Sequence, residues 1–231
     1  MRAVILAGGY GKRLRPLTEE IPKNLVPVLG KPLIEWQIEW LSSQGIKDFV
    51  LLTGYLGEKI VERLGDGSSL GVRITYSHEK TPLGTGGALM NAYDILKDDE
   101  EFIMVNGDVI TNLKIDRLLE LEEEYVGAIA LVPLPSPYGI VKFDESGRIQ
   151  AFIEKPLIKD YWINAGVYLL RNKIFEYLPA KGDIERTAFP KLAAEGRLRA
   201  VTYADVLWKS IDTHKDLEEA AKMLEEAGGR L

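Results

Sequence analysis

The chain has 231 residues and a formal net charge of −6, from 29 lysines and arginines against 35 aspartates and glutamates, which does not favour a nucleic-acid or acidic-membrane partner. It contains no cysteine, so disulfides, thiolate metal sites and cysteine nucleophiles are excluded. The length and a hydrophobic content of 46% suit one large α/β domain or two small ones. No apolar run reaches transmembrane length and the first strand begins at once, so we expect a cytoplasmic protein with no membrane contact.

The first predicted element is a buried strand over residues 3–6, an apolar run that ends abruptly at glycine. The loop after it is rich in glycine, so its backbone can approach a ligand closely at little steric cost. A glycine-rich turn between a strand and a group of cations is suited to hold phosphates. The glycines are Gly8, Gly9 and Gly11, and the cations are Lys12, Arg13, Arg15 and Lys23.

Two common phosphate-binding loops do not account for this stretch. A P-loop requires Gly-Lys followed by Ser or Thr, whereas Gly11 and Lys12 precede Arg13. The dinucleotide fingerprint requires a third glycine at the position of Leu14, after Gly9-x-Gly11. An ordinary tight turn with surface cations is the alternative that the pattern leaves open.

The next elements alternate between helices and strands. Helices are predicted over residues 32–43 and 58–64, and strands over residues 49–53, 72–76 and 102–105. This succession is typical of a parallel sheet with right-handed crossovers. The predicted fold class is therefore α/β, with a Rossmann-like, mostly parallel mixed sheet flanked by helices.

A second glycine-rich loop and an acidic strand end extend the candidate site. The run Gly-Thr-Gly-Gly at residues 84–87 precedes a helical pattern that reaches Ile95, and so places backbone N–H groups at a helix N-terminus. Asp108 ends the strand over 102–105, where open α/β sheets bind ligands, and Gly107 before it is expected to leave room for a phosphate and a metal. A carboxylate is a hard oxygen ligand suited to Mg²⁺. The alternatives are a loop that binds nothing and, for Asp108, a helix N-cap.

Beyond residue 132, antiparallel signals replace the parallel ones. A hairpin is predicted over residues 139–156, with its turn at Glu145-Ser146-Gly147. We therefore divide the single domain 1–231 into a first part, 1–132, and a smaller antiparallel lobe, 133–231. The other elements expected around the lobe are helical spacing at 115–121, a strand at 128–132 ended by prolines 133, 135 and 137, a strand at 162–170, a helical stretch at 183–195 broken near Pro190, strands at 198–203 and 206–211, and a last helix at 215–227.

The first stretch resembles the signature of the sugar-1-phosphate nucleotidyltransferases, Leu-Ala-Gly-Gly-x-Gly-Thr-Arg-Leu, which continues to Pro-Lys-x-Leu-Val/Leu-Pro-Val. Lys12 stands where this family usually has Thr. Later motifs occur in the same order, so the resemblance covers nearly the whole chain. Many members continue into a left-handed β-helix domain that this sequence lacks, so no second activity is expected. The residues that match the signature are Gly8, Gly9, Gly11, Arg13, Leu14, Pro22, Lys23, Leu25, Pro27 and Val28.

The resemblance implies transfer of a nucleotidyl group from a nucleoside triphosphate to a sugar 1-phosphate, with Mg²⁺ as cofactor. It implies that Arg13, Lys23 and Asp108 are catalytic and that Asp108 binds the metal. The family's second metal ligand is an Asp at the position of Ser210. We assign that contact to Asp212, because residues two apart in a strand face the same way, with the N-cap of the last helix as the alternative. The implied nucleotide-binding residues are Leu6, Ala7, Gly8, Gly9, Gly11, Lys12, Arg13, Lys23, Glu79, Gly84 and Thr85.

The resemblance assigns the sugar phosphate to the second lobe, so that 1–132 is the nucleotide-binding part and 133–231 the sugar-phosphate-binding part. Gly139, Asn164 and Gly166 match residues beside the sugar. Glu154 would accept hydrogen bonds from sugar hydroxyls and Lys155 would hold the phosphate, with a simple surface pair as the alternative. The expected partners are the two substrates, and a homo-oligomer is left open.

Glu79 bears on the choice of nucleotide. The corresponding family position is often Gln in enzymes that use UTP or dTTP. A carboxylate only accepts hydrogen bonds, and guanine offers two adjacent donors, so Glu79 favours GTP. The resemblance is closest to the guanylyltransferases that act on mannose or heptose 1-phosphate. The alternatives are a uridylyl- or thymidylyltransferase acting on glucose 1-phosphate and, in another class, a non-catalytic regulatory subunit that binds nucleotide sugars.

Overall fold

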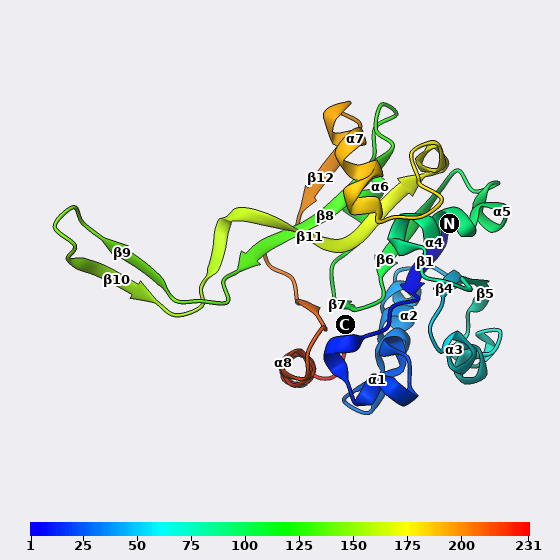
Figure 1. The fold of residues 1–231 in the computed structure, drawn as a ribbon, viewed down its shortest axis with the longest axis horizontal. Coiled ribbons are helices and arrows are strands. Elements are labelled where there is room, and N and C mark those ends of the chain that lie inside the picture. The colour runs from blue at the N-terminus through cyan, green and yellow to red at the C-terminus, as the bar shows by residue number, and fades with distance from the viewer.

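One seven-stranded sheet organises the protein. The computed structural model describes all 231 residues and gives the strand order β12-β8-β11-β6-β1-β4-β5 (Figure 1). β11 runs antiparallel to both its neighbours, and the other neighbouring pairs are parallel. The predicted mostly parallel mixed sheet is thus confirmed. The strands are β1 (Arg2–Ala7), β4 (Asp48–Thr53), β5 (Arg73–His78), β6 (Glu101–Asn106), β8 (Gly127–Pro135), β11 (Leu157–Arg171) and β12 (Leu198–Thr202).

Helices cover both faces of this sheet because its central strands are apolar on both sides. In β1, Ala3 and Ile5 pack into one buried cluster with residues of α2 and α3, and Val4 packs into another with residues of α4, α5 and α7. Such two-sided burial is characteristic of parallel sheets. None of the helices has the length and apolar composition needed to cross a membrane. The α-helices are α1 (Leu17–Glu20), α2 (Leu33–Ser43), α3 (Gly57–Leu64), α4 (Gly84–Asn91), α5 (Tyr93–Leu96), α6 (Asp116–Leu119), α7 (Ala188–Ala194) and α8 (His214–Glu226).

Two of the three prolines expected to end the strand at residue 132 lie inside β8. Pro133 and Pro135 pair with β11, whereas the pairing of β12 with β8 stops at Leu131. Beyond Leu131, the side of β8 that faces β12 therefore has no partner strand that would need a backbone N–H from either proline. Proline is tolerated at such an edge.

Three helical predictions needed correction in their extent. The pattern that reaches Ile95 forms two helices, α4 and α5, and the spacing at 115–121 forms only the single turn of α6. The stretch at 183–195 is interrupted before α7 rather than near Pro190. Pro190 lies in the first turn of α7, where a backbone N–H has no helical partner, so its ring does not break the helix.

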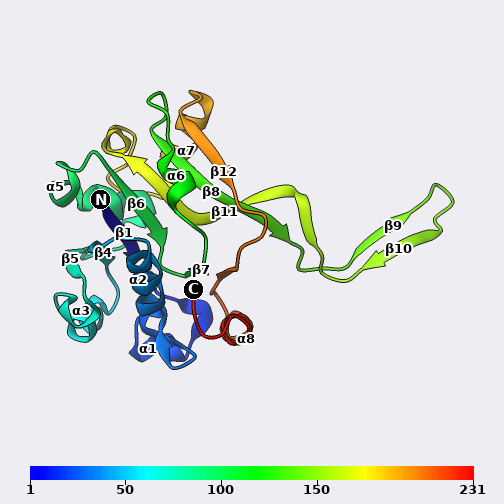
Figure 2. The same cartoon turned by 180° about the vertical axis from the view of Figure 1, so that it is seen from behind.

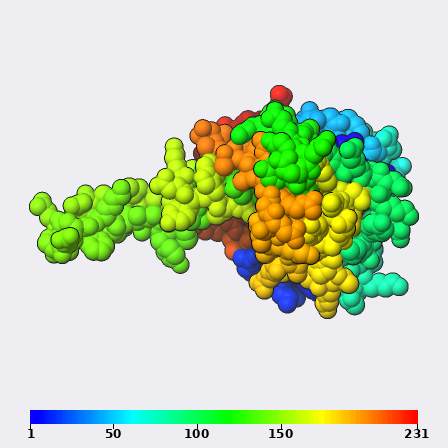
Figure 3. Space-filling model, turned by 90° about the horizontal axis from the view of Figure 1, so that it is seen from above, coloured from blue at the N-terminus to red at the C-terminus, as the bar shows by residue number.

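The predicted boundary at residue 132 lies within β8, and both parts of the chain contribute strands to the main sheet. The predicted hairpin consists of β9 (Ile140–Phe143) and β10 (Ile149–Ile153), which project as an arm from the rest of the molecule (Figures 2 and 3). β13 (Trp208–Ser210), expected to extend over 206–211, pairs with β7 (Val109–Thr111) instead of joining the main sheet. A last short pair joins β2 (Pro27–Val28) and β3 (Lys31–Pro32).

Candidate active site

A pocket of about 400 Å³ opens at the carboxyl ends of β1, β4 and β6. Leu6 from β1 and Leu52 from β4 contribute to its lining. The loop after β1, the start of α4 and the turn after β6 supply the rest of its main surfaces. This is the edge at which open α/β sheets bind ligands.

The glycine-rich loop bends back over the sheet edge at Gly11. This residue adopts φ +58°, in the left-handed region that favours glycine, and it begins a short 3₁₀ helix over Lys12–Leu14. The hydroxyl of Thr18 donates to the Gly11 carbonyl at 2.9 Å. The loop thereby turns Lys12 and Arg13 towards the pocket, whose lining includes both.

Gly107 fixes the turn that carries Asp108, for a reason that differs from the predicted one. A Cβ atom at this position would lie 1.9 Å from the Leu6 carbonyl oxygen and 2.2 Å from Nδ2 of Asn24. The space beside Gly107 is therefore filled by β1 and by Asn24, rather than left for a ligand. β7 follows this turn, so the reading of Asp108 as a helix N-cap is wrong.

Two carboxylates and two cations meet in this pocket. Nζ of Lys23 lies 2.8 Å from Oδ2 of Asp108 and 2.9 Å from Oδ1 of Asp212. Nη2 of Arg13 lies 2.8 Å from the same oxygen of Asp212. The formal charges of these four groups cancel, although they come from three distant parts of the chain. The lysine side chain is only 12% exposed, so this contact is shielded from bulk water.

Asp212 reaches the pocket by a route other than the predicted strand repeat. β13 ends at Ser210, and Asp212 lies in the connection to α8, with Ser210 Oγ 3.4 Å from its Oδ2. The N-cap of α8 is Thr213, so the reading of Asp212 as the cap is wrong. Oδ2 of Asp216 accepts from the backbone N–H groups of Asp212 and Thr213 at 3.1 and 2.8 Å. The cap of α8 thus positions Asp212.

Asp216 makes this cap sensitive to acid. Burial alone would raise its pKa, but hydrogen bonds from Lys209 and Thr213 outweigh that effect and hold the pKa at about 2. A pKa below the ordinary value of 3.8 contributes stability that is present above pH 4 and is lost as the pH falls towards 2. We expect Asp216→Asn to lower the free energy of unfolding at neutral pH by about 1–2 kcal/mol.

The difference in free energy of unfolding between the wild type and Asp216→Asn should shrink as the pH falls from 4 towards 2, because the wild type then loses the same charge. Urea unfolding at both ends of this pH range measures the difference. Asp205→Asn, a change of the same type at an exposed residue, is the control and should show no such dependence. A deficit that is constant with pH would contradict this role of the carboxylate.

Glu79 lines the same pocket as the two carboxylates. Its Oε2 accepts from the backbone N–H of Leu83 at 3.0 Å. A Cβ atom added to Gly8 or to Gly54 would lie 2.8 Å from Oε1 of Glu79. The backbones of these two glycines therefore lie close to the carboxylate. Burial raises the pKa of the Glu79 carboxyl, and the hydrogen bond from Leu83 partly offsets that shift.

The structure brings together most of the residues predicted for the nucleotide and the metal, but not those predicted for the sugar. Gly139, Glu154 and Lys155 lie on or beside the arm, outside the pocket lining. Asn164 and Gly166 lie in β11, and a Cβ on Gly166 would meet the side chain of Asn106, a pocket residue. Ala7 is buried in the core. The predicted residues that line the pocket are Leu6, Gly8, Gly9, Gly11, Lys12, Arg13, Lys23, Glu79, Gly84, Thr85, Asp108 and Asp212.

Two polar residues that support the site were not singled out from the sequence. Nδ2 of Asn24 donates to the Gly107 carbonyl at 2.7 Å. Nε2 of Gln37 donates to the carbonyls of Asn106 and Val109, at 2.9 and 2.8 Å. These bonds hold both sides of the turn at Asp108. The signal for Gln37 was its position between two apolar residues, Trp36 and Ile38, on the helix that follows the glycine-rich loop.

The fold and the site together define a class of protein, that of the nucleotide-diphospho-sugar transferase fold. Residues 2–227 match the family described as Nucleotidyl transferase, and the chain belongs to this family.

Relatives and solved structures agree with this assignment. The chain is 37% identical over 225 residues to a mannose-1-phosphate guanylyltransferase catalytic subunit beta of Danio rerio and 39% identical over 226 residues to mannose-1-phosphate guanylyltransferase 1 of Arabidopsis thaliana. In each case the match covers 94% of this chain and 62% of the relative. The chain thus spans less than two thirds of the length of these relatives. The crystal structure of HddC from Yersinia pseudotuberculosis has a TM-score of 0.76 at 29% identity, covering 96% of this chain and 98% of that one, and it has also been solved complexed with GMP-PN.

Proposed function

We propose that the protein transfers a nucleotidyl group from a nucleoside triphosphate, with GTP favoured, to a sugar 1-phosphate, with mannose 1-phosphate favoured, and releases pyrophosphate. The observation that carries this proposal is the meeting of Arg13, Lys23, Asp108 and Asp212 in one pocket beside a glycine-rich loop. The names of the guanylyltransferase relatives and the GMP-PN complex of HddC support the choice of nucleotide and sugar.

The reaction needs little covalent chemistry from the protein. An oxygen of the sugar phosphate attacks the α-phosphorus, a new P–O bond forms, and the bond from the α-phosphorus to the bridging oxygen breaks to release pyrophosphate. That attacking oxygen is already an anion, so no strong general base is required. The protein must bring two polyanions together and stabilise the charge that develops between them. Arg13 and Lys12 would contact the β- and γ-phosphates, and Lys23 would contact the α-phosphate.

The acidic pair fits a divalent cation. Oxygens of Asp108 and Asp212 both lie within 2.9 Å of one cationic atom, Nζ of Lys23, so they already converge on a single positive charge. No third acidic or imidazole side chain joins them. Two carboxylates with the remaining positions left to water and phosphate are the usual protein share of a Mg²⁺ site. Asp108 and Asp212 would hold Mg²⁺, which neutralises charge on the phosphate oxygens when it is bound.

The test of the proposed function is pyrophosphate release in the presence of Mg²⁺, with each common nucleoside triphosphate crossed against mannose, glucose, heptose and N-acetylglucosamine 1-phosphates. Release with GTP and mannose or heptose 1-phosphate is expected. Preference for UTP or dTTP would retain the reaction but reverse the assignment of the base. No release with any pair would overturn the proposal and favour a regulatory subunit.

Glu79→Gln tests the base assignment separately. We expect the preference for GTP over UTP, as the ratio of kcat/KM values, to fall by about 10- to 100-fold, because an amide cannot accept from both guanine donors. Glu62→Gln, the same change on the exposed face of α3, is the matched control. The wild-type preference should also decline at acidic pH, since the raised pKa of Glu79 favours its protonated form. An unchanged ratio in Glu79→Gln would remove this residue from base recognition.

A further inference from the structure

The arm formed by β9 and β10, residues 139–156, has one strongly apolar face. In the pairing of the two strands, Val141 lies opposite Phe152 and Phe143 lies opposite Ile149. Directly opposed residues of an antiparallel pair point to the same side, so these four side chains share one face. A bulge between Ile149 and Ala151 keeps Ile149 on this face. Phe143, Ile149 and Phe152 are 68%, 62% and 65% exposed.

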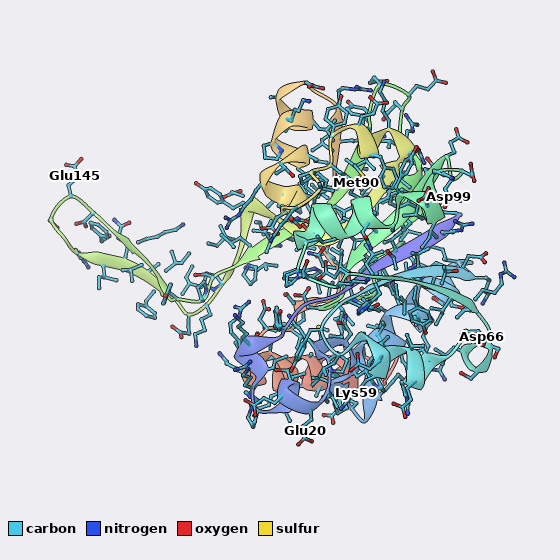
Figure 4. All side chains as sticks on the ribbon, turned by 45° about the vertical axis from the view of Figure 1, so that its right-hand side comes forward. Glu20, Lys59, Asp66, Met90, Asp99 and Glu145 are labelled. Atoms are coloured by element: carbon cyan, nitrogen blue, oxygen red, sulfur yellow. The ribbon has the colours of Figure 1, made fainter.

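The chain itself does not cover this face. Figure 4 shows Glu145, at the turn of the arm, far from the rest of the molecule, and Figure 3 shows the arm as a separate projection. A two-stranded hairpin is at best marginally stable in water unless another element packs on it. Further exposed apolar side chains lie in the chain next to the arm, at Tyr138, Leu157, Tyr161 and Trp162. An exposed apolar face such as that of the arm is typical of an interaction site.

The accessible surface area of the chain is larger than that of a compact monomer of the same mass. The chain exposes 12051 Å². A compact monomer of its mass, 25.8 kDa, should expose about 10,500 Å², so the excess is about 1,500 Å². A specific interface of standard size needs only about 800 Å² from each partner. The excess area of the whole chain is therefore larger than one partner's share of such an interface.

The charges of this region favour a second copy over a charged partner. Residues 138–161 contain four cations and four carboxylates, although the whole chain carries a net charge of −6. A surface that meets a copy of itself across a two-fold axis must be self-complementary. A neutral arm with an apolar face meets this condition, because it does not repel its own copy. The cations are Lys142, Arg148, Lys155 and Lys159, and the carboxylates are Asp144, Glu145, Glu154 and Asp160.

We propose that a second copy of this chain covers the apolar face of the arm, so that the protein is a dimer held together by its two arms. Burial of the two phenylalanines and their aliphatic neighbours supplies the main stabilisation of this contact. The inference rests on the apolar face of the arm and not on the pocket, and its test measures mass rather than turnover, so its outcome is separate from that of the proposed reaction even though Glu154 and Lys155 lie at the end of the arm.

Light scattering after size exclusion tests this proposal with the full chain. We expect the wild type at micromolar concentration to have twice the chain mass of 25.8 kDa. The double variant Phe143→Ser/Phe152→Ser should have the mass of a single chain, with an unchanged far-ultraviolet circular dichroism spectrum apart from the arm. The matched control is Val61→Ser, which removes an apolar side chain that is 42% exposed on α3, and it should stay dimeric.

Hydrogen exchange provides a second measurement that does not depend on the variants. The amides of β9 and β10 should gain protection as the protein concentration rises through the dimer dissociation constant. A wild type that is monomeric throughout, or a double variant that is still dimeric, would overturn the proposal. Arm amides protected equally at every concentration in a monomer would show that the arm folds back on its own chain, which also overturns it.

Discussion

Replacing Asp108 with Asn is expected to lower the rate of pyrophosphate release by about 10²–10³-fold, with little change in the melting temperature. The substitution keeps the size of the side chain and removes one of the two negative charges that surround Nζ of Lys23. The backbone of this residue is held independently of its carboxylate, because its carbonyl accepts from the N–H of Ile211 at 2.8 Å. The loss should therefore fall on catalysis rather than on the fold.

The double variant Asp108→Asn/Asp212→Asn tests whether the two carboxylates act on the same cation. Groups that act as a unit give strongly non-additive losses, so the double variant should be little slower than the worse single variant. The measurement is the single-turnover rate as a function of Mg²⁺ concentration, and each single variant should need more Mg²⁺ to reach half of its maximal rate.

Asp94→Asn, at an exposed position on α5, is the control for a lost carboxylate. A near-normal rate in Asp108→Asn would remove this residue from the reaction. Independent, multiplicative losses would mean that Asp108 and Asp212 serve different groups.

The sequence predicted many of the residues that line the pocket because the signals there are local. A strand that ends in glycine fixes where its loop emerges, and parallel strands end at one edge of their sheet. The loop at Gly8–Lys12 and the strand end at Asp108 are therefore expected at the same edge from the sequence alone. The predicted position of the hairpin was also correct, because its turn residues and alternating pattern lie within 18 residues.

The remaining errors concern where elements end and how they are placed relative to other segments. Whether Pro133 interrupts a strand depends on where β12 ends, some 70 residues later in the sequence. The position of Asp212 depends on the cap of α8 rather than on a strand repeat. Glu154 and Lys155 were assigned to the sugar phosphate by their motif, but their distance from the pocket is set by the direction of the arm, which no local pattern encodes. Their role in binding the sugar phosphate is still a prediction.

Gly107→Ala is expected to cost about 3 kcal/mol or more of the free energy of unfolding and to abolish turnover with it. A Cβ here would lie 1.9 Å from the Leu6 carbonyl oxygen, well inside any contact that atoms can make without movement. Leu6 belongs to β1, which pairs with β4 and β6, so it cannot shift without disturbing the centre of the sheet. Gly107 has no left-handed φ, so the effect is purely steric.

Denaturant unfolding monitored by tryptophan fluorescence measures this cost, and Gly9→Ala is the matched control. Gly9 lies in the glycine-rich loop after β1, has no left-handed φ, and a Cβ there would meet no atom within 4 Å. Its alanine variant should therefore unfold within about 1 kcal/mol of the wild type. Adding Asn24→Ala to Gly107→Ala should not restore stability, because it removes the contact at 2.2 Å but leaves the closer one with Leu6. A rescue by that second change would mean that Asn24, and not β1, sets the position of the turn that presents Asp108.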